Sequence, residues 1–75
     1  MNITDILVHV RTDLDSEDRN TVEEELREVD GVIAPRFTEY NEHMLVVAYN
    51  PIKLNTGGLM KKFVSMGLDA SLVGM

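Results

Sequence analysis

The fold is decided by VEEELREVDGV, residues 22–32, which predicts the end of a helix and the start of a strand. Val22, Leu26 and Val29 recur at a spacing that places them on one helix face, and glutamates cover the other faces. Gly31 is typical of a helix C-terminus, and Val32 opens a run with β-branched residues. The stretch therefore predicts an amphipathic helix that turns directly into a strand.

Upstream, residues 6–10 (ILVHV) form an apolar run that predicts a strand. Asp15 and Ser16 are then placed to cap the N-terminus of the helix. Glu17 and Asp18 follow in the first turn, where the helix dipole favours negative charge. The first half of the chain thus predicts a strand followed by a helix.

Downstream, residues 32–38 predict a second strand, and Pro35 assigns it to a sheet edge because proline cannot donate a ladder hydrogen bond. A short polar turn at residues 39–42 leads to the apolar run 44–49, which suits a central strand. The two strands should form a hairpin.

The last third predicts a helix and a strand. Thr56 is expected to cap a helix with an apolar stripe of Leu59, Phe63 and Met66, and Gly67 should end it. Residues 68–73 complete the chain as a short strand.

The order βαββαβ predicts an α+β, ferredoxin-like sandwich. Right-handed crossovers place both helices on one face of a four-stranded antiparallel sheet, with strand order 4-1-3-2. At 75 residues, the chain is expected to be a single domain spanning 1–75.

Three segments carry a resemblance to a family. Residues 22–32 resemble V-E-x-x-L followed by G-V, residues 47–51 (VAYNP) resemble V-x-Y-D-P, and residues 63–70 (FVSMGLDA) are similar to I-x-x-x-G-Y-x-A. These motifs are those of heavy-metal-associated domains, found in copper chaperones, mercury-binding proteins and metal-transporting ATPases. The resemblance covers nearly the whole chain and implies the same ferredoxin-like fold.

The chain departs from this family in the loop before the first helix. The family holds a soft metal there with G-M-x-C-x-x-C, but counting back from Val22 places its cysteine positions on Asp15 and Asp18. The Gly-Met pair falls on Thr12 and Asp13. Carboxylates suit hard cations and do not replace thiolates on Cu(I), so soft-metal binding by this loop is not expected.

Composition excludes several functions. Without cysteine there is no disulfide, no thiolate nucleophile and no cysteine metal site. The net charge of -6 argues against nucleic acid as a partner. No run approaches the roughly 20 apolar residues of a membrane span, so a cytoplasmic protein without membrane contact is expected. No catalytic motif or cofactor site is visible, and an enzyme is not expected.

Two metal hypotheses arise from the remaining ligands. Asp13, Asp15 and Asp18 offer oxygens to a hard cation, although helix capping and solvation also explain them. His9 with Met44 offers nitrogen and sulfur to copper, although a lone histidine on a strand is more often structural. Metal binding is possible but not favoured.

The predicted open face of the sheet carries few polar groups. Because strand side chains alternate, inward-pointing Ile6, Val8 and Val10 leave their neighbours on the other face. The same alternation on residues 44–49 completes an outward-facing set that we interpret as an interaction face: Leu7, His9, Met44, Val46 and Ala48.

The sequence therefore favours a non-catalytic, heavy-metal-associated-like domain that has lost its thiolate site and acts as a protein-interaction module. It would work as a homodimer or as an accessory to a larger protein, with its acidic first helix facing a basic surface. The alternative is a metal-binding or transport accessory protein with carboxylate or His/Met ligands.

Overall fold

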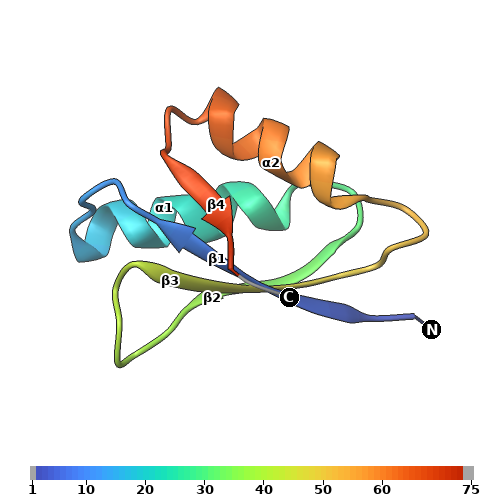
Figure 1. Ribbon diagram of the computed structural model, residues 1–75, viewed down its shortest axis with the longest axis horizontal. Helices are drawn as coiled ribbons and strands as arrows, with labels where there is room; N and C mark the ends of the chain where they lie inside the picture. The colour runs from blue at the N-terminus through green and yellow to red at the C-terminus, as the bar shows by residue number, and fades with distance from the viewer. Residues whose placement is uncertain (1, 74–75) are drawn as a thin grey trace.

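The computed structural model describes residues 2–73 and has two layers, with two helices above one sheet (Figure 1). Six elements follow in the predicted order: β1 Thr4–Val10, α1 Ser16–Arg27, β2 Val32–Phe37, β3 Met44–Tyr49, α2 Thr56–Ser65 and β4 Ala70–Leu72. The α+β class is confirmed. No helix within residues 2–73 is long and apolar enough to cross a membrane.

The sheet is antiparallel, with order β2-β3-β1-β4, which is the predicted 4-1-3-2 in reverse. Apolar β1 and β3 are central, and proline-containing β2 lies at an edge, as predicted. An irregularity between Val32 and Ala34 shifts the register of β2, so Ile33 bulges from the ladder.

The core lies between the helices and the inner face of the sheet. Each central strand contributes every second residue, and each helix contributes residues four apart, as their apolar periods require. The buried hydrophobic side chains are Ile6, Val8, Val10, Val22, Leu26, Phe37, Leu45, Val47, Tyr49, Leu59 and Phe63. The core covers only the inner face of the sheet, and the opposite face does not take part in it.

Capping residues set where the helices begin. Asp15 caps α1 as predicted, because its Oδ1 accepts the N–H of Asp18 at 2.7 Å. The prediction for α2 is wrong by one residue: Asn55, and not Thr56, is the cap, and its Oδ1 accepts the N–H of Gly58 at 2.7 Å. Asn55 has the extended backbone that a cap requires, whereas Thr56 is already helical.

Helix α1 ends earlier than its apolar stripe predicts, because Val29 lies beyond its last residue. Helix α2 ends as predicted, since Met66 is its C-cap and Gly67 follows at φ +75°. The final strand is also shorter than residues 68–73, because the N–H of Leu68 still donates to Phe63 of the helix and that of Asp69 donates to Thr12 Oγ1. Only from Ala70 does the chain pair with β1.

Candidate functional site

The outer face of the sheet is the side away from the helices (Figure 1). Its centre is built by strand alternation: Leu7 and His9 on β1 are half-buried between fully buried neighbours. Met44, Val46 and Ala48 on β3 show the same pattern. Leu7 pairs with Val46 and His9 pairs with Met44 in the β1–β3 register. The structure thus places the five residues of the predicted interaction face together on two neighbouring strands.

Two charged side chains that the sequence interpretation did not include share this face. Asp5 pairs with Ala48, and Arg36 of β2 pairs with Val46, so both project on the same side as the apolar centre. Both residues are exposed, and neither side chain forms a hydrogen bond or ion pair with the rest of residues 2–73. The outer face therefore carries one free carboxylate and one free guanidinium around an apolar centre.

A hollow of about 560 Å³ adjoins this face. Its lining joins Arg36 and Val46 of the outer face to the β2–β3 hairpin, through Phe37, Thr38, Glu39 and Tyr40. The hairpin projects away from the helices (Figure 1), and its residues 37–40 line the hollow. Tyr40 is 86% exposed. The sequence shows a polar turn here but not that it bends toward the open face.

The β2 edge of the sheet is closed to strand addition. The N–H of Thr38 donates inward to Met44 at 2.9 Å, so the preceding N–H, of Phe37, faces the free edge. Glu23 Oε2 of α1 accepts this edge N–H at 2.9 Å. Pro35, two residues earlier on the same edge, has no N–H. Both edge-facing positions are therefore unable to donate to another strand.

The opposite edge, β4, is three residues long and is held by Arg11. The guanidinium donates to Asp69 Oδ1 at 2.6 Å, Asp69 Oδ2 at 3.1 Å and Ser71 Oγ at 2.9 Å. These hydrogen bonds from Arg11 lower the pKa of Asp69 below its ordinary value of 3.8. A very short edge strand offers little backbone for pairing with another chain.

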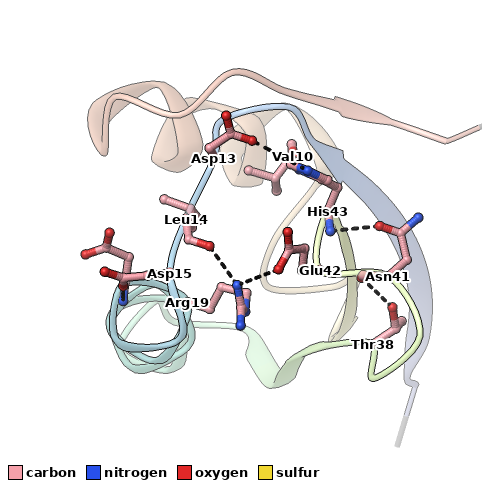
Figure 2. A network of polar contacts seen from close by, with 10 residues as sticks. Val10, Asp13, Leu14, Asp15, Arg19, Thr38, Asn41, Glu42 and His43 are labelled. Carbon is pink, nitrogen blue, oxygen red and sulfur yellow. Dashed lines mark hydrogen bonds and ion pairs between the residues drawn. The ribbon is translucent and has the colours of Figure 1, made fainter.

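The loop that the family resemblance associates with metal, residues 11–15, is held by polar contacts from α1 and from the β2–β3 hairpin (Figure 2). Arg19 of α1 donates to Leu14 O at 2.7 Å and to Glu42 Oε2 at 3.2 Å. His43 places Nδ1 at 2.8 Å from Val10 O and Nε2 at 3.7 Å from Asp13 Oδ1. The loop is thereby fixed to the helix and to the hairpin.

The aspartates of this loop are used differently. The carboxylate of Asp15 is the helix cap, while the side chain of Asp13 is 99% exposed beside His43. Within residues 2–73, no group of three or more His, Asp or Glu side chains gathers as a metal site would require. His9 and His43 lie edge to face with ring centroids 6.2 Å apart. The structure thus assigns Asp15 a structural role.

Negative charge is concentrated away from the outer face. Residues 13–30 hold nine of the thirteen acidic side chains and two of the seven basic ones, so this segment carries -7 and the rest of the chain +1. The segment runs from the β1–α1 loop through α1, which lies in the helix layer (Figure 1). The outer face, with Asp5 and Arg36, is close to neutral.

No protein-family model matches the sequence, and no curated protein matches it. Several solved structures resemble the chain, among them the following three. Oxidized MerP from Ralstonia metallidurans CH34 is 20% identical, with a TM-score of 0.84 over 97% of this chain and 100% of that one. A copper-binding domain from HMA7, a P-type ATPase, is 20% identical, with a TM-score of 0.82 over 93% of each chain.

The third is the Cu(I)-loaded N-terminal domain of a potential copper-translocating P-type ATPase from Bacillus subtilis. It is 18% identical, with a TM-score of 0.84 over 97% of this chain and 90% of that one. At these identities the likeness shows the fold alone. The predicted ferredoxin-like fold is confirmed, and it is the fold of heavy-metal-associated domains.

Proposed function

We propose that this domain acts by protein contact, through self-association on the outer face of its sheet, and does so without a thiolate metal site. The observation that carries this proposal is the apolar centre formed by Leu7 and Val46 on the two central strands, on the face opposite the helices (Figure 1). An antiparallel sheet with a solvated face ordinarily alternates apolar and polar residues. Here the outer positions of β3 are all apolar.

The charge distribution supports a second copy as the occupant. A basic partner would be attracted to residues 13–30, which carry the excess negative charge, and these lie in the loop and helix layer. The strands of the outer face instead carry one unpaired charge of each sign, Asp5 and Arg36, beside the paired Arg11 and Asp69. A near-neutral face lets two copies of a protein with a net charge of -6 approach with their acidic helices turned away.

The closed edges support face-to-face contact. Pro35 and the Phe37–Glu23 hydrogen bond disfavour strand addition at β2, and β4 is short. Two copies would then pack sheet against sheet, as the layers of β-sandwiches do. Three strands about 20 Å long and the half-length β4, spaced about 4.8 Å apart, give a face of roughly 350 Å² in projection, which is small for a protein interface and predicts a weak dimer.

Sedimentation velocity of the wild type and of three variants tests this function in the presence of chelator. Val46→Glu and Ala48→Glu place a carboxylate in the centre of the outer face, and both are expected to keep the protein monomeric at concentrations where the wild type dimerises. The control is Val64→Glu on α2, where Val64 is 73% exposed and should leave dimerisation unchanged. A monomeric wild type at millimolar concentration would overturn the proposal.

A metal-handling role takes second place. Two of the similar structures are named for copper, but this chain has no cysteine, and no three His, Asp or Glu side chains gather within residues 2–73. If self-association required a metal ion, adding chelator would abolish it. We assign no catalytic step to the domain, and a cytoplasmic location stays an expectation from the sequence.

A further inference from the structure

We propose that two copies meet in one defined register, in which Arg36 of each copy pairs with the partner's Asp5 at the mouth of the hairpin hollow. This inference rests on the proposed self-association and adds the two residues that select the partner and its orientation. Arg36 and Asp5 are exposed on the outer face and have no side-chain polar partner within residues 2–73. Two such groups of opposite sign on one face are self-complementary when the face is turned onto itself.

The strand register fixes where the two charges lie. Arg36 on β2 is level with Val46 on β3, and Asp5 on β1 is level with Ala48 on β3. Since β3 lies between β2 and β1, the charges lie on opposite sides of β3 and two residues apart along it. They are therefore diagonal to each other across the apolar centre.

A two-fold axis can satisfy both charges at once. To bring Arg36 over the partner's Asp5 and the partner's Arg36 over Asp5, the axis must pass midway between the two, over β3 between Val46 and Ala48. Val46, Ala48 and the neighbouring Leu7 then lie at the middle of the interface. The arrangement that pairs the two charges therefore also buries the apolar centre, with the charge pairs around it.

The hollow provides space for the incoming strand. Arg36 and Val46 of the outer face line it together with the hairpin residues as far as Tyr40. The start of the partner's β1 would enter it, bringing the carboxylate of the partner's Asp5 to the guanidinium. Glu39 also lines the hollow but forms no ion pair with Arg36 in the described chain. The guanidinium is therefore available to a carboxylate from outside.

Charge-swap variants of the whole chain test the register by sedimentation velocity. Asp5→Arg sets two arginines against each other in a homodimer, and Arg36→Asp sets two aspartates against each other. Each single variant is expected to weaken dimerisation about ten-fold or more. An equimolar mixture of the two should dimerise, because both pairs are then restored. The double variant D5R/R36D should dimerise alone for the same reason.

Lys61→Asp on α2 is the matched control for Arg36→Asp, since it makes the same change in net charge at an exposed site in the helix layer. It should leave dimerisation unchanged. If the wild type dimerises but the mixture and the double variant do not recover, the register is wrong while self-association stands. If Val46→Glu also leaves the dimer intact, or the wild type is monomeric, the proposed function itself fails.

Discussion

Arg11 and Asp69 are joined by two parallel hydrogen bonds, Nε to Oδ2 at 3.1 Å and Nη2 to Oδ1 at 2.6 Å, between residues 58 positions apart in the sequence. The pair ties the loop after β1 to the start of β4, and the N–H of Asp69 donates to Thr12 Oγ1 at 2.9 Å in the same place. The β1–α1 loop, which occupies the position of the metal-binding loop in the family it resembles, is therefore held in place by hydrogen bonds that join Arg11 and Thr12 to Asp69.

This pair should make stability depend on pH in the acidic range. The hydrogen bonds from Arg11 hold the pKa of Asp69 below 3.8, so the paired carboxylate stabilises the fold above that value. The contribution is lost as the pH falls through the lowered pKa. We expect Asp69→Asn to be less stable than the wild type in urea unfolding at pH 7, and the difference to shrink as the pH falls below 3.8.

Asp30→Asn is the matched control for Asp69→Asn. Asp30 meets Lys53 at 3.7 Å, and its side chain is 87% exposed, so its removal should change stability little at either pH. If the free energy of unfolding depended on pH in the same way for the two variants, the Arg11–Asp69 pair would have no particular effect on stability.

Glu23 protects the β2 edge, and its loss should both destabilise the fold and open that edge. Glu23→Ala leaves the partly buried N–H of Phe37 without its acceptor, which costs about 1–3 kcal/mol. Faster amide exchange of Phe37 is expected with it. Glu24→Ala on the same helix is exposed and should be near neutral. Glu23→Gln keeps an acceptor oxygen and should recover most of the stability; no difference between Glu23→Ala and Glu24→Ala would refute the role.

Alanine substitutions at the two glycines with positive φ should distinguish the cost of backbone strain from the cost of a steric clash. Gly67, at φ +75°, has open space where a Cβ would lie, so Gly67→Ala should lower the free energy of unfolding by about 1–2 kcal/mol through strain alone. Gly31, at φ +102°, would place a Cβ 2.7 Å from Leu54 Cβ, so Gly31→Ala should be clearly worse. Urea unfolding of both variants checks the order, and equal losses would contradict it.

The aspartates of the β1–α1 loop should affect helix stability and not ion binding. Asp15→Ala removes the cap on Asp18 N–H and is expected to lower stability by about 1 kcal/mol, whereas Asp13→Ala should have little effect. Millimolar Ca²⁺ or Mg²⁺ should not raise the melting temperature of the wild type. A saturable increase that Asp15→Ala abolishes would restore the hard-cation hypothesis.

Local patterns made most of the fold predictable. The alternation on residues 44–49 predicted both the burial of Leu45, Val47 and Tyr49 and the outward side of Val46. Successive side chains of a strand point to opposite faces, so the face that packs on the core also determines which residues point away from it. Pro35 predicted the edge position of β2 through its missing N–H. These inferences need only the neighbouring residues.

Contacts between distant elements were not predictable in the same way. Arg36 could not be assigned to a face, since the irregularity near Ile33 shifts the register of β2 and reverses the parity of its side chains. Asp5 was missed because β1 begins at Thr4, two residues before the apolar run, although continuing the alternation back from Leu7 would have found it. The Glu23–Phe37 hydrogen bond depends on how α1 packs beside β2, which no local pattern states.

A dilution series of ¹⁵N-amide spectra, recorded with and without chelator, tests whether the outer face binds a second copy without metal. We predict concentration-dependent shifts that cluster on the outer-face strands at Asp5, Leu7, Arg36, Val46 and Ala48, and that chelator does not alter. Spectra that do not change with concentration, or shifts confined to residues 11–15 that chelator removes, would show that the outer face does not bind a second copy in this way.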